Sequence, residues 1–150
     1  MASKRSAILE YMRGTLLPAI TTGGGFNNTV SRVERGLRYP DEINDSEFPA
    51  VFVAQTEETR QNLTKIHFQS DLSVSIVGFV KSLNGTSGAQ LALDGLIEDL
   101  TKKLEADRQQ GGLVNWTEIK RVKTDVGDLD PIAACAIEVH FTYTTEGTNP

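Results

Sequence analysis

A long stretch of alternating polar and apolar residues, Asn62–Ser82, restricts the fold of this chain more than any other feature. Successive side chains of a β-strand point to opposite faces of its sheet, so the alternation predicts a long strand with one apolar face. The expected faces are Leu72, Val74, Ile76 and Val80 on one side, and Ser73, Ser75, Val77 and Phe79 on the other. The polar residues 69–71 fit either a turn between two strands or one uninterrupted ribbon, and both interpretations stay open.

Four further segments have strand patterns, which makes about five strands in all. They are residues 27–36, 50–55, 113–124 and 132–145. In the last segment, alternation predicts an inward row formed by Cys135, Ile137, Val139, Phe141 and Tyr143. The segment at 113–124 is basic, with Lys120, Arg121 and Lys123, which is typical of a solvated edge strand.

Two segments have helical spacing. Ser3 can cap a first helix, which we expect to end near Leu17 because Pro18 restricts its last turn. A turn is expected at Asn84–Gly88, and a long helix follows it. The apolar stripe of that second helix consists of Leu93, Ile97, Leu100 and Leu104. Gly111 is a plausible terminator beyond it.

The order of these elements is α-β-β-β-α-β-β, and 150 residues suffice for one domain with a substantial core. Strands grouped in runs with few helices predict an α+β fold. We therefore expect one domain over residues 1–150, ordered from about 4 to 145. It would hold a mostly antiparallel sheet of about five strands with two helices packed on one face.

Three glycines, Gly23–Gly25, follow the first helix and suggest a phosphate-binding loop. Such a loop requires a Gly-Lys-Ser/Thr ending that leads into a helix. Here Phe26-Asn27-Asn28 follows, and the loop leads into a strand. The glycines are therefore expected to form a flexible connection, and no nucleotide or other cofactor is expected.

Metal and catalytic sites are not expected either. Asp125, Asp128 and Asp130 lack the spacing of a calcium loop, and His67 and His140 stand apart. Cys135 lies on the apolar face of the last strand, where a buried, inert thiol is expected. The adjacent acids Glu57-Glu58 and Glu98-Asp99 are interpreted as solvated faces. We therefore predict no catalytic residues, and the protein is not expected to be an enzyme.

Charge and composition exclude other classes. The formal net charge of −5 disfavours a nucleic-acid binder, which needs clustered basic residues. No stretch reaches the roughly 18 apolar residues of a membrane helix, and the first residues lack the apolar region of a signal peptide. The one cysteine predicts synthesis in a reducing cytoplasm.

The order and spacing of several short motifs resemble the tail terminator (tail completion, head-tail joining) proteins of long-tailed bacteriophages. The motifs are Phe48-Pro49-Ala50-Val51, Gly78-Phe79-Val80-Lys81, Gly111-Gly112-Leu113-Val114, Thr124-Asp125 with Gly127, and a last strand ending in Tyr143. The resemblance covers residues 4 to 145. It implies a virion protein, made in the host cytoplasm, that forms a hexameric ring on the head-proximal end of the tail tube. The ring would stop tube growth and join the tail to the neck, without catalytic residues or cofactor.

The partners implied are six copies of the chain, the tail tube protein and the neck or head-tail connector proteins. In a contractile tail the sheath protein would be added, and genomic DNA would pass through the lumen without specific binding. We expect interfaces on the acidic loop Tyr39–Pro49 and along the long strand, because long loops are often functional. The candidates are Asp41, Glu42, Asp45, Glu47, Phe48, Glu57, Arg60, Lys65, Asp125, Asp128 and Asp130. The loop acids would also suit a lumen through which DNA slides.

Two alternatives stay open. A neck or head-closure adaptor shares the small size and the ring assembly. A small cytoplasmic α+β enzyme or ligand-binding domain would instead have a defined pocket and a stable monomer.

Overall fold

The computed structural model describes residues 3–82, 85–125 and 131–146. The first helix, α1 (Lys4–Tyr11), continues through a π-helical turn to Leu16 and a 3-10 turn to Ala19. A 3-10 turn at Thr22–Gly24 leads to β1 (Arg32–Arg35), and two more at Pro40–Glu42 and Asp45–Glu47 precede β2. The remaining elements are β2 (Ala50–Asn62), β3 (His67–Lys81), α2 (Gly85–Ala106), a 3-10 turn at Gln110–Gly112, β4 (Trp116–Thr124) and β5 (Ile132–Glu146).

The predicted fold class is confirmed: two helices cover a five-stranded, mostly antiparallel open sheet. The strand order is β1-β2-β3-β5-β4, and only the pair β1–β2 is parallel. The element order α-β-β-β-α-β-β is also as predicted. Strand β4 lies at an edge, as its basic residues indicated.

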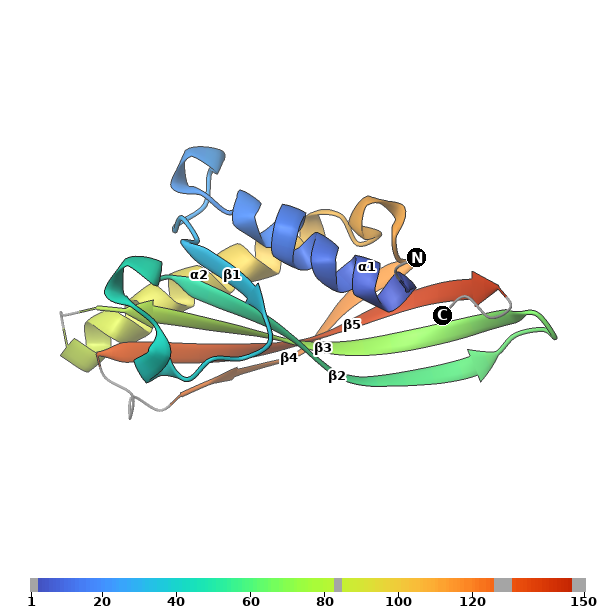
Figure 1. Ribbon diagram of the computed structural model, residues 1–150. Coiled ribbons are helices and arrows are strands. Elements are labelled where there is room, and N and C mark those ends of the chain that lie inside the picture. Colours follow the sequence, from blue (N-terminus) through green and yellow to red (C-terminus); the bar gives the residue numbers. More distant parts are fainter. Residues whose placement is uncertain (1–2, 83–84, 126–130, 147–150) are drawn as a thin grey trace.

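The helices α1 and α2 lie on the same side of the sheet, and the main core fills the space between (Figure 1). The alternation of β3 and β5 was interpreted correctly, because the predicted inward residues of both strands are buried there. Helix α2 contributes Leu93, Leu96, Leu100 and Leu104, so Leu96 takes the central place that we assigned to half-buried Ile97.

Several boundaries differ from the prediction. Residues 69–71 lie inside β3, and the turn between β2 and β3 falls at 63–66 instead. Strand β2 continues to Asn62 rather than Gln55, because its polar outer half pairs with β3 through the backbone. Helix α2 begins at Gly85, so the turn predicted for Asn84–Gly88 is wrong from residue 85 onward. Asn84 itself lies outside the described residues.

A smaller apolar cluster lies on the opposite face of the sheet, at one end. It consists of Ile43, Phe48, Ala50, Phe52, Val77, Phe79, Ile132 and Ala134. The rings of Phe52 and Phe79 pack edge to face with centroids 5.8 Å apart. The segment that we predicted as a flexible acidic loop therefore packs on this face through Ile43 and Phe48. The rest of the face is polar and uncovered by helices (Figure 1).

Candidate interaction surfaces

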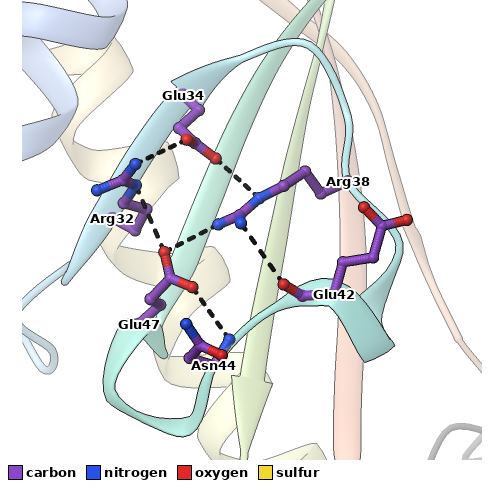
Figure 2. A network of polar contacts seen from close by, with 6 residues as sticks. All are labelled: Arg32, Glu34, Arg38, Glu42, Asn44 and Glu47. Carbon is purple, nitrogen blue, oxygen red and sulfur yellow. Dashed lines mark hydrogen bonds and ion pairs between the residues drawn. The ribbon is translucent and has the colours of Figure 1, made fainter.

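The loop between β1 and β2 is held by four ion pairs (Figure 2). They join two arginines and two glutamates in a closed circuit in which positive and negative side chains alternate. Arg38 contacts Glu34 and Glu47 at 2.9 Å each. Arg32 contacts Glu34 at 2.9 Å and Glu47 at 3.5 Å. The amide of Asn44 donates to Glu47 Oε1 at 3.0 Å. That amide, followed by the Arg38 guanidinium, lowers the pKa of Glu47 below the ordinary 4.5.

The four predicted loop acids consequently fall into two groups. Glu47 is enclosed by the two arginines, and Asp45 pairs with Lys81 of β3 at 2.5 Å. Asp41 and Glu42 lie exposed on the 3-10 turn Pro40–Glu42, and within the described part of the chain their carboxylates form no ion pair. Asp41 and Glu42 are thus the two loop acids outside these ion pairs, while the side chain of Asp45 is 82% exposed.

Replacing Glu47 by glutamine is expected to loosen the loop, because both arginines lose a carboxylate. Hydrogen exchange should show lower protection of the Asn44 amide. Low pH should have the same effect on the wild type: a carboxylate with a lowered folded-state pKa stabilises above its ordinary pKa, and that contribution is lost as the pH falls through the lowered value. Glu42→Gln, which preserves all four ion pairs, is the control; equal protection in both variants would contradict the assignment.

The other predicted interface residues are dispersed. Glu57 is exposed on β2, and Lys65 is exposed in the β2–β3 turn. Arg60 stacks over the ring of Phe68, with its Cζ atom 4.8 Å from the ring centroid. Asp125 is half-buried and accepts from the amide of Ala134 at 2.9 Å. Asp128 and Asp130 lie outside the described residues. The structure thus brings the loop acids together but does not join them to these other candidates.

Of the acids that we interpreted as solvated, Asp99 is buried and Glu58 is half-buried. Asp99 of α2 is 1% exposed, and its carboxylate accepts from the amides of Asn27 and Asn28 at 2.9 and 2.8 Å and from the Asn28 side chain at 3.1 Å. The connection that follows Gly23–Gly25 is therefore fastened to α2. The spacing of the sequence could have indicated this burial, because Asp99 follows the buried Leu96 by three residues and so lies on the same helix face.

Glu58 is half-buried, with a side chain 11% exposed. It binds Arg5 of α1 at 2.5 Å and accepts a hydrogen bond from the Tyr143 hydroxyl of β5. Burial, followed by this hydrogen bond, raises the pKa of Tyr143 to about 12. Glu58 thus joins the start of the first helix to the sheet, while its neighbour Glu57 is exposed as predicted.

Among the described residues, large apolar side chains are exposed at four separate places, one of which is Leu91 of α2, 74% exposed. Leu37 and Tyr39 follow β1, at one edge of the sheet. Trp116 and Val122 lie on β4, at the other edge. Leu63 and Ile66 occupy the turn at the tip of the β2–β3 hairpin, which extends past the helices (Figure 1).

The polar face of the sheet holds a partly open depression, a pocket of about 180 Å³. Small-molecule sites usually measure about 300–1,000 Å³. In the described residues, no group of three histidine, cysteine or acidic side chains is arranged to hold a metal. Cys135 is buried as predicted, and burial raises the pKa of its thiol to about 11. Among the described helices, none has the length and apolarity to span a membrane.

No protein-family model matches this chain, and the search of curated proteins gives no match either.

Proposed function

We propose that this protein is a tail terminator subunit that forms a hexameric ring on the head-proximal end of a phage tail tube. The ring would stop tube elongation and join the tail to the neck. The proposal starts from the motif order described above. The structural observation that carries it is the exposure of different apolar side chains at the two edges of one sheet, Leu37 and Tyr39 beyond β1 and Trp116 and Val122 on β4.

Two different surfaces at the two edges of the sheet are suited to head-to-tail assembly. A ring built from identical subunits requires each copy to present two different, mutually complementary patches. A two-fold dimer instead uses one patch on both copies. Monomeric proteins seldom expose clustered large apolar side chains without a partner. The arrangement of the two edges therefore favours a closed ring or a filament over an isolated monomer.

The β2–β3 hairpin supplies a third surface, directed away from the helices. Its tip exposes Leu63 and Ile66 together with Lys65. Once the two sheet edges are used between subunits, the tip remains for a different partner. The tail tube protein and the neck proteins are the partners that the proposal assigns to such surfaces, with the sheath protein added in a contractile tail. Genomic DNA would pass through the ring unbound.

Light scattering of the purified protein over a wide concentration range tests the proposal. We expect a discrete species of six subunits that appears ring-shaped by negative-stain electron microscopy. A monomer at every concentration, unchanged when tail tubes are added, would contradict it. That result would favour the enzyme or ligand-binding alternative.

A further inference from the structure

The cationic side of β4 borders the pocket on the polar face of the sheet. The pocket is lined by Thr56, Ser75, Arg121, Lys123, Ala136 and Glu138. Lys120, also on β4, pairs with Glu118 at 3.0 Å. Arg121 and Lys123 are exposed, and in the described part of the chain neither forms an ion pair. Two cations and one carboxylate therefore leave this pocket with a net positive charge.

The pocket is suited to a protein side chain. Its volume of about 180 Å³ is below the usual range for small-molecule sites, but a carboxylate side chain fits within it. An arginine and a lysine side by side can bind a carboxylate by charge-assisted hydrogen bonds, which are stronger than neutral ones. The chemistry of the pocket therefore selects an acidic side chain on a protruding segment.

Such a segment exists on the same chain. The loop residues 37–47 contain four acids and one arginine, and that arginine, Arg38, is already paired. Asp41 and Glu42 are exposed on the 3-10 turn Pro40–Glu42, next to the exposed Tyr39. The turn is held in place by the circuit of ion pairs, so little loop entropy is lost when it binds.

We propose that the acidic turn Pro40–Glu42 of one subunit binds the cationic pocket at Arg121 and Lys123 of the next. The occupant is a second copy of this chain, because the two surfaces are complementary in charge but do not contact each other within a subunit. Because the acidic turn and the cationic pocket are different surfaces, the contact between subunits is head-to-tail. The exposed Tyr39 flanks the acidic turn and adds apolar area to the contact. The inference rests on the proposed ring and names the interface that closes it.

Charge reversal on both sides tests the interface. Arg121→Glu with Lys123→Glu makes the pocket acidic, and Asp41→Lys with Glu42→Lys makes the turn basic. We expect each double variant alone to require at least about tenfold more protein for half assembly, measured by light scattering. The quadruple variant carries both reversals on one chain. It should assemble at close to the wild-type concentration, since its basic turn again faces an acidic pocket.

Lys4→Glu with Lys102→Glu is the matched control, because it changes the net charge as much as the pocket variant does and lies away from β4, from the acidic turn and from the hairpin tip. We expect it to assemble like the wild type. Assembly of both reversed double variants at the wild-type concentration would overturn the interface and leave the ring standing. Failure of the quadruple variant to recover would also overturn the pairing. A wild type that stays monomeric with and without tail tubes would overturn the ring itself.

Discussion

Replacing Asp99 by alanine is expected to lower the free energy of unfolding by about 3 kcal/mol. The Asp99 carboxylate is buried and accepts three hydrogen bonds from Asn27 and Asn28, two of them from backbone amides. Hydrogen bonds to a charged group contribute more than neutral ones, and a buried amide left without an acceptor carries its full desolvation cost. The loss should appear in urea denaturation as a lower midpoint.

Glu98→Ala is the matched control, because Glu98 is the exposed neighbour on the same helix. Surface substitutions of this kind usually change stability by no more than about 0.5 kcal/mol. A loss of similar size in both variants would contradict the assignment of Asp99 as the anchor of the glycine-rich connection.

Replacing Gly78 by valine is expected to cost about 2 to 3 kcal/mol. Gly78 lies on β3, on the face that packs against α2. A Cβ atom there would stand 2.8 Å from Leu96 Cδ2 and 3.2 Å from Cys135 Sγ. The valine would therefore push α2 away from the sheet, or force Leu96 and Cys135 out of their rotamers. Thermal unfolding monitored by circular dichroism measures the effect as a lower Tm.

The control for Gly78 is Ser73→Val on the same strand. Ser73 is on the polar face, half-buried, with no helix above it. The same side chain placed there should leave the Tm nearly unchanged, since valine has a high β-propensity. Equal losses in Gly78→Val and Ser73→Val would show that strand β3 tolerates valine poorly on both faces. The close approach of α2 would then not be the cause.

The fold class could be predicted because it depends on the periodic spacing of apolar residues, which can be read within each segment of the sequence. Strands β3 and β5 alternate over their length, so which of their residues are buried follows from the sequence. The outer half of β2 has no such pattern: residues 56–62 are polar, and they pair with β3 in an antiparallel ladder. Hydropathy carries no signal for a segment whose strand conformation is imposed by its partner.

The partners of Asp99 and Glu58 could not be predicted for a related reason. Asp99 meets Asn27 and Asn28 across more than seventy residues, and Glu58 meets Tyr143 across 85. A charged residue is normally exposed unless a partner compensates it, and these partners come together only in the folded chain. The loop acids show the same limit, because the sequence indicates a loop there but not the circuit that neutralises Glu47.

The proposed function is tested most directly by electron microscopy of tail tubes mixed with the gold-labelled protein. We expect one ring at one end of each tube and none along its length, and tubes capped in this way should stop elongating. A neck adaptor would instead leave the bare tubes unlabelled and label them only after a terminator is added. Labelling along the whole tube, or no labelling in either case, would contradict the assignment of this chain to the junction between tail and head.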